Sequence, residues 1–217
     1  MVGYLIFMHP ETLAPKTKKL LEKIGTHQWL KDYYLAGGTA LALQLGHRQS
    51  IDLDFFTKKN INTPQLIAIL SKEGVFKLLK EEKDTVEGLL DGVKVSFMSY
   101  PYSLIEKQIR FDKNIFLASA HDIALMKLTA IAGRNTKKDF IDLFVYLLKD
   151  KKDIQGLLKD MKKKFKGVDY DSMHICKSLV YFEEADKEPI PVMFIQKLVN
   201  WKKVKDYFIG EVKKIMV

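Results

Sequence analysis

Residues 35–56 read LAGGTALALQLGHRQSIDLDFF and combine a glycine turn, a short apolar helix and a strand that carries two acids. Residues 33–36 are expected to form a short strand. Gly37 and Gly38 allow a tight turn, Thr39 is predicted to N-cap a helix over residues 40–45, and Gly46 is predicted to end it. The segment therefore predicts a strand, turn, helix and strand in close succession.

The glycine turn is a candidate phosphate site. A helix N-terminus has unpaired backbone N–H groups and a positive dipole end, and glycines let a phosphate approach the main chain closely. The Thr39 hydroxyl adds a donor, so Gly37, Gly38 and Thr39 are candidate nucleotide-binding residues. The plain alternative is a turn with no ligand, because Gly-Gly before a helix is common.

Two aspartates lie in the apolar strand predicted at residues 51–56. The period of two puts Asp52 and Asp54 on one face, and the apolar Ile51, Leu53 and Phe55 on the other. Two neighbouring carboxylates repel unless a cation lies between them, and hard oxygen ligands suit Mg²⁺ or Mn²⁺. The alternative is a pair of solvated charges at a strand end.

A second informative region contains a lysine in an apolar helix. Residues 123–133 read IALMKLTAIAG, with Lys127 as the only charge, and Arg134 falls on nearly the same face. A buried lysine needs an anion, either a protein carboxylate or a ligand phosphate. The helix predicted at residues 136–148 offers Asp139 and Asp142 on one polar strip. Either Lys127 and Asp139 form an ion pair that only joins two helices, or Lys127 holds a triphosphate while Asp139 orients it or takes part in acid-base chemistry.

The chain resembles the AbiEii family of nucleotidyltransferase-like toxins over nearly its whole length. The resemblance rests on Gly37, Gly38, Thr39, Asp52, Asp54, His121, Asp122, Ile123, Lys127, Ala130, Arg134, Lys138, Asp139, Asp142 and the segment 178–191. It implies an α+β fold in which a polymerase-beta-like mixed sheet with flanking helices (residues 1–117) precedes a C-terminal helical bundle (residues 118–217).

The resemblance also implies a function. Such a protein transfers a nucleoside monophosphate from an NTP to an acceptor hydroxyl, which in some members belongs to tRNA, and an antitoxin neutralises many members. Asp52 and Asp54 would hold the metal. Gly37, Gly38, Thr39, Lys127 and Arg134 would bind the nucleotide, and Lys127 and Asp139 would complete the catalytic set.

One position departs from the polymerase pattern. Such sites often have a third carboxylate on a neighbouring strand, but the strand predicted at residues 92–100, GVKVSFMSY, has Ser96 where an acid is expected. Two other hypotheses remain open, and Ser96 motivates the first of them. One is a non-catalytic RNA- or protein-binding module on the same fold, and the other is a sugar-nucleotide glycosyltransferase, which also uses Asp-x-Asp and a divalent metal.

Composition sets broader limits. The 217 residues are 47% hydrophobic, enough for a substantial core, and the net charge of +9 is spread over both halves. Strands are expected at residues 75–80, 85–90 and 93–100, with a hairpin at Asp91-Gly92, and helices from residue 118 onward. Cys176 is the only cysteine, so no internal disulfide forms. No apolar run approaches a membrane span, and a cytoplasmic location is expected.

Overall fold

The computed structural model describes residues 8–168, 170–195 and 199–216. In this part of the chain one mixed sheet has the strand order β3-β4-β5-β2-β1-β7-β6. The strands are β1 (Tyr34–Ala36), β2 (Leu53–Thr57), β3 (Phe76–Glu82), β4 (Thr85–Leu90), β5 (Val93–Ser99), β6 (Ile109–Arg110) and β7 (Phe116–Leu117).

The outer part of the sheet is an antiparallel meander, as predicted. β3 pairs with β4 and β4 pairs with β5, both antiparallel. Asp91 and Gly92 have φ of 49° and 79°, the left-handed values that a tight two-residue hairpin turn requires. β5 then runs parallel to β2, which brings Ser96 opposite Asp54. The strands predicted at residues 85–90 and 93–100 are confirmed.

The helix after the glycines begins earlier than predicted. α2 spans Gly37–Leu45 with Ala36 at the N-cap position, and no side chain caps it. Thr39 lies inside the first turn, where its hydroxyl donates to the backbone oxygen of Asp52 and shares a 2.7 Å hydrogen bond with Ser50. The prediction that Thr39 caps this helix is therefore wrong. Gly46 ends the helix in the left-handed region, with φ of 62°, as predicted.

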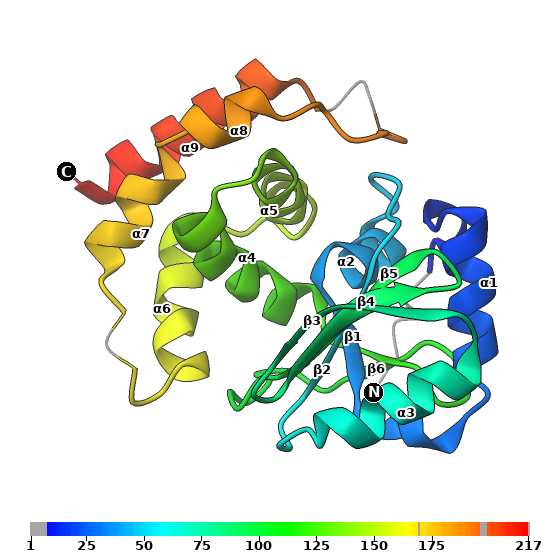
Figure 1. Cartoon of the computed structure of the whole chain (residues 1–217). Helices are drawn as coiled ribbons and strands as arrows, with labels where there is room; N and C mark the ends of the chain where they lie inside the picture. Colours follow the sequence, from blue (N-terminus) through cyan, green and yellow to red (C-terminus); the bar gives the residue numbers. More distant parts are fainter. Residues whose placement is uncertain (1–7, 169, 196–198, 217) are drawn as a thin grey trace, which may run out of the picture.

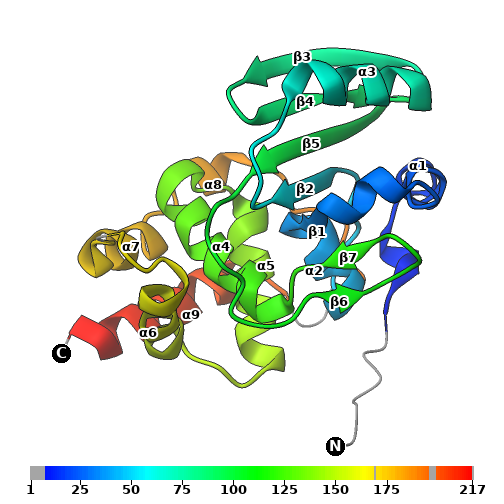
Figure 2. The same ribbon diagram turned by 90° about the horizontal axis from the view of Figure 1, so that it is seen from below.

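The other helices fall into two groups. α1 (Pro15–Ile24) and α3 (Thr63–Glu73) lie on the outer side of the sheet, and the helices that follow the last strand gather on the opposite side (Figures 1 and 2). The helices of this second group are α4 (Ala120–Arg134), α5 (Lys137–Lys149), α6 (Ile154–Lys164), α7 (Ser172–Leu179), α8 (Glu183–Lys187) and α9 (Trp201–Met216). Short 3-10 helices occur at Pro10–Thr12 and Gln28–Asp32.

α2 joins the sheet to the second group of helices. It contacts β1 and β2 on one side and α4 and α5 on the other, and most of its side chains are buried. Its apolar residues therefore belong to one core that continues from the sheet into α4 and α5. The predicted fold class is confirmed: α+β with a mixed sheet and flanking helices, followed by C-terminal helices. The division at residues 117 and 118 stays a prediction.

No helix in the described ranges has the length and apolar character that crossing a membrane requires.

Candidate active site

Two glycines bring the start of α2 against charged side chains. Gly37 has φ of 63°, and a Cβ on it would lie 2.6 Å from Oδ2 of Asp54. A Cβ on Gly38 would lie 2.2 Å from Nη2 of Arg48. Any larger residue at either position would displace one of these groups. Both glycines thus allow close approach at a helix N-terminus whose first N–H groups lack a side-chain cap.

Asp54 and Asp52 form an unneutralised pair. Asp54 lies in β2 between the buried Leu53 and Phe55, so it faces the opposite side of the sheet. Burial and the neighbouring charge of Asp52 raise the pKa of Asp54 above its ordinary value. In the described part of the chain, neither carboxylate accepts a hydrogen bond or forms an ion pair within 4 Å.

These properties fit a divalent cation. A shared metal relieves the repulsion between neighbouring carboxylates, and Mg²⁺ is typically held by one or two carboxylates together with substrate phosphates. No described cluster of three or more acids, histidines or cysteines could hold a metal alone. Asp52 and Asp54 are thus the described residues that could hold such an ion together with oxygen atoms of a ligand.

The strand beside Asp54 lacks a third acid. Ser96 of β5 pairs with Asp54 in register and is buried. The next residue along this row is Glu87 of β4, which pairs with Ser96. Two strand spacings place the Cα atom of Glu87 roughly 10 Å from that of Asp54, and its carboxylate lies 3.7 Å from Nζ of Lys94. Ser96 is thus the nearest side chain on the neighbouring strand.

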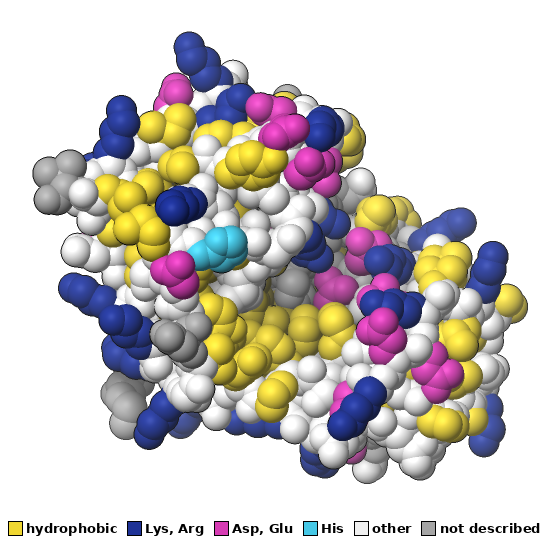
Figure 3. Space-filling model, turned by 60° about the vertical axis from the view of Figure 1, so that its left-hand side comes forward, with side chains coloured by type: hydrophobic (Ala, Val, Ile, Leu, Met, Phe, Trp, Pro, Cys, Tyr) yellow, Lys and Arg dark blue, Asp and Glu magenta, His cyan; other side chains and the backbone are white. Residues whose placement is uncertain are grey.

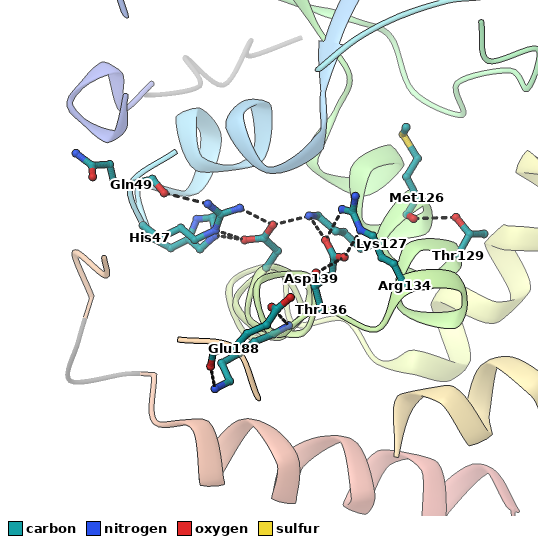
Figure 4. Close-up of polar contacts among 12 residues, drawn as sticks. His47, Gln49, Met126, Lys127, Thr129, Arg134, Thr136, Asp139 and Glu188 are labelled. Atoms are coloured by element: carbon teal, nitrogen blue, oxygen red, sulfur yellow. Dashed lines mark hydrogen bonds and ion pairs between the residues drawn. The ribbon is translucent and has the colours of Figure 1, made fainter. Parts of the chain in front are cut away.

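Lys127 lies at the centre of a buried charge network between α4 and α5 (Figure 4). Its Nζ lies 2.6 Å from Oδ1 of Asp139 and 2.6 Å from Oδ2 of Asp142. Asp139 also accepts hydrogen bonds from Nε and Nη2 of Arg134, at 2.7 and 3.0 Å, and from the Thr136 hydroxyl at 2.7 Å. The Lys127–Asp139 ion pair considered from the sequence is present, and it is one part of a larger cluster.

Asp142 extends the network to the loop before the acid pair. It accepts hydrogen bonds from Nε and Nη2 of Arg48, at 2.6 and 2.9 Å, and pairs with Nε2 of His47 at 2.8 Å. Burial lowers the pKa of His47 and outweighs the opposite effect of Asp142. The lowered pKa keeps the imidazole neutral at neutral pH. The sequence assigned no partner to Asp142, because 94 residues separate it from Arg48.

The network keeps its carboxylates ionised. Burial alone would raise the pKa of Asp139, but Lys127 and Arg134 outweigh it and hold that pKa well below the usual range. Arg48 and Lys127 do the same for Asp142. Burial would lower the pKa of Lys127, yet the two carboxylates raise it. Three cations therefore face two carboxylates, which leaves the cluster net positive beside Asp54.

Two cavities meet at this cluster. The polar cavity, of about 290 Å³, is lined by Asp52, Asp54 and several cationic side chains. The apolar cavity, of about 350 Å³, is lined mainly by hydrophobic side chains. Asp54, Lys127 and Arg134 line both. The polar cavity is lined by Gly38, Thr39, Arg48, Gln49, Ser50, Ile51, Asp52, Asp54, Lys94, Lys127, Arg134, Lys138, Pro191 and Val192.

The structure thus brings together the residues singled out in the sequence. Gly37 lines the apolar cavity, and Asp139 lies behind Lys127, in contact with it. Sequence reasoning missed Lys94 and Val192, whereas Pro191 ends the segment 178–191 that the family resemblance included. Val192 reaches the site because its backbone oxygen accepts a 2.8 Å hydrogen bond from the N–H of Gln49. For Arg48, the only hint from the sequence was that it lies close to Asp52 and Asp54 along the chain.

The chain is similar to several known proteins. The family model described as "Nucleotidyl transferase AbiEii toxin, Type IV TA system" matches residues 19–111. An uncharacterized protein of Aquifex aeolicus, aq_aa25, is 39% identical over 207 residues, which cover 94% of this chain and 98% of that protein. A Megavirus polyadenylate synthase superposes on 72% of this chain with a TM-score of 0.45 and 18% identity, and the match spans 33% of the viral chain. The chain is thus homologous to aq_aa25 over nearly its whole length, and its residues 19–111 belong to the AbiEii nucleotidyl transferase family.

Proposed function

We propose that this protein transfers a nucleoside monophosphate from an NTP to an acceptor hydroxyl in the polar cavity, with Mg²⁺ or Mn²⁺. The observation that carries the proposal is the unneutralised pair Asp52 and Asp54 beside an uncapped helix N-terminus and a net positive cluster. The metal, when bound, would neutralise phosphate charge and polarise the phosphoryl oxygens.

The residues of the cavity have distinct roles in this proposal. Asp52 and Asp54 hold the metal. The N–H groups of Gly37, Gly38 and Thr39 face the phosphates, and the exposed Lys138 and half-exposed Arg134 neutralise them. Lys127 adds positive charge from behind and is held in place by Asp139 and Asp142. Catalysis would thus be positioning and charge stabilisation, as pyrophosphate leaves.

The test is transfer of label from each α-³²P NTP to total RNA with Mg²⁺. We expect the wild type to label RNA and Asp54→Asn to lose at least about a hundredfold in rate, since it removes one of two metal ligands. The matched control is Asp206→Asn, which changes an exposed carboxylate on α9. Equal labelling by wild type and Asp54→Asn would overturn the proposed site.

In this proposal, the acceptor of the nucleoside monophosphate is either an RNA or a protein. A net charge of +9 favours a polyanionic acceptor such as tRNA or another RNA. The family description also supports an antitoxin protein as a partner. The size of the labelled band in the same gel identifies the acceptor class.

Ser96 beside Asp54 favours one second candidate, a non-catalytic RNA- or protein-binding module on the same fold. Such a module would bind RNA with an affinity that falls steeply with salt and survives Asp52→Ala and Asp54→Ala. A filter-binding titration at two salt concentrations, run beside the transfer assay, separates the two functions.

A further inference from the structure

The apolar cavity continues the face of the sheet that carries Asp54. Phe56 follows Asp54 by two residues in β2, and Met98 follows Ser96 by two residues in β5. The two strands pair Phe56 directly with Met98. Residues two apart on a strand share a face, about 6.6 Å apart. Phe56 and Met98 therefore begin the floor of the apolar cavity, and this floor starts one same-face spacing along the strand from Asp54.

One face of α4 forms the opposite wall. Met126, Ala130 and Gly133 line the cavity at helical spacing, together with Ile123. Lys127, which follows Met126, reaches both cavities from the same helix. Figure 3 shows a band of hydrophobic side chains in a hollow on this side of the molecule, with charged side chains along its margin. A ligand that fills both cavities must have a charged part and an apolar part.

An aromatic cluster fixes the floor. The Phe56 ring stacks on Tyr34 at 6.0 Å between centroids and 24° between planes, and meets Tyr100 edge to face at 5.6 Å. Both tyrosine hydroxyls are buried, so Tyr100 lines the cavity with its ring. The floor thus offers π surface without an exposed phenol.

The uncharged polar side chain in this cavity is Thr129. Its hydroxyl donates its one hydrogen to the backbone oxygen of Met126 at 2.8 Å, so toward a ligand it can only accept a hydrogen bond. A single hydroxyl distinguishes the edges of the four bases poorly, whereas stacking tolerates any base.

We propose that the apolar cavity holds the nucleobase of the NTP by stacking and apolar contact, with little discrimination among bases. The inference rests on the proposed function, because it assumes that the triphosphate occupies the polar cavity. A mononucleotide suits the two cavities because they share Asp54, Lys127 and Arg134, so that one ligand spans both without an acceptor. A volume of about 350 Å³ is at the small end of ligand sites, which span about 300–1,000 Å³.

The test measures binding without an acceptor, by calorimetry with Mg²⁺. The probes are the α,β-methylene analogues of the four NTPs, and inorganic tripolyphosphate, which lacks base and sugar. We expect the four analogues to bind within about tenfold of one another, since stacking is sequence-tolerant. We expect each to bind more tightly than tripolyphosphate.

Two variants change the apolar cavity. Phe56→Ala should weaken the nucleotide analogues about ten- to hundredfold and leave tripolyphosphate unchanged. Ala130→Leu fills the cavity from α4 without removing a core side chain, and should have the same selective effect if Phe56→Ala folds poorly. Lys138→Ala should weaken nucleotides and tripolyphosphate alike, because it acts on phosphate. Tyr181→Ala, at an exposed aromatic residue outside both cavities, is the control.

The outcomes separate this inference from the proposed function. If nucleotides bind but neither Phe56→Ala nor Ala130→Leu affects them, the base lies elsewhere and the inference is wrong, while nucleotidyl transfer stands. A single base preferred by more than about a hundredfold would also overturn it, because stacking alone discriminates less. If neither tripolyphosphate nor any analogue binds, the proposed function fails as well.

Discussion

The folded environment of Asp54 disfavours its ionised form. Burial and Asp52 raise its pKa, so the folded protein resists ionisation of this group more than the unfolded chain does. Stability contributed by this group is thus greatest at low pH and falls as pH rises from about 3.9, the unfolded pKa, through the raised folded pKa. The folded state carries the largest cost at pH values above the raised folded pKa of Asp54.

Asp54→Asn should therefore raise the thermal unfolding midpoint of metal-free protein at pH 7, even though we expect it to slow transfer. The increase should shrink as pH falls toward the unfolded pKa, because the wild-type carboxyl is then protonated too. Thermal unfolding by circular dichroism in EDTA, at several pH values, measures this. A lower midpoint for Asp54→Asn at pH 7 would contradict the account.

Single residues also mark where sequence reasoning succeeded and where it failed. The alternation around Asp54 was readable because the strand period is local. The cap assigned to Thr39 was wrong because a tertiary partner, the backbone oxygen of Asp52, takes its hydroxyl. The place of Asp142 could not be read, since its partners Arg48 and His47 lie more than 90 residues away in the chain.

At the scale of elements, α4 and α5 are joined by buried charges as well as by apolar packing. Asp142 accepts hydrogen bonds from Arg48 and also contacts Lys127, all of them buried. Removing one member of such a cluster leaves uncompensated charge in a region of low dielectric. The carboxylate of Asp142 therefore holds several parts in one arrangement: the loop with Arg48, the start of α2, and helices α4 and α5.

Asp142→Asn should lower the free energy of unfolding by about 3–5 kcal/mol at pH 7, because Arg48 and Lys127 lose their shared anion. The pKa of Asp142 is depressed, so its contribution is present above the unfolded pKa and is lost as pH falls through the folded one. Urea unfolding measures the change. Asp206→Asn, the exposed control, should stay within about 0.5 kcal/mol, and an equally small effect of Asp142→Asn would refute the coupling.

Elements with strong local signals were predictable. The strands at residues 85–90 and 93–100 and the apolar helix with Lys127 follow from periodicity and from the Asp91-Gly92 turn. Of the five lysines at residues 159–166, four are exposed and only Lys164 is not. Lys164 is buried and pairs with Asp122 at 2.7 Å, a contact between distant segments that no local pattern reveals.

At the scale of the whole molecule, the candidate site is shared between two parts of the chain. The sheet and α2 supply the glycines and the acid pair, and α4 and α5 supply Lys127, Arg134 and Asp139 (Figures 1 and 4). The sequence predicted both parts and their order. It could not predict the two cavities, because their shape depends on how α4 packs against the sheet.

The most direct test of the account asks which phosphorus atom stays on the acceptor. Wild-type protein, Mg²⁺ and RNA are incubated in parallel with α-³²P and γ-³²P forms of one NTP, and pyrophosphate is quantified. Nucleotidyl transfer predicts label on RNA from the α form only, with one pyrophosphate released for each nucleotide added. Label from the γ form, or no label from any NTP in the presence of salt-sensitive RNA binding, would contradict it.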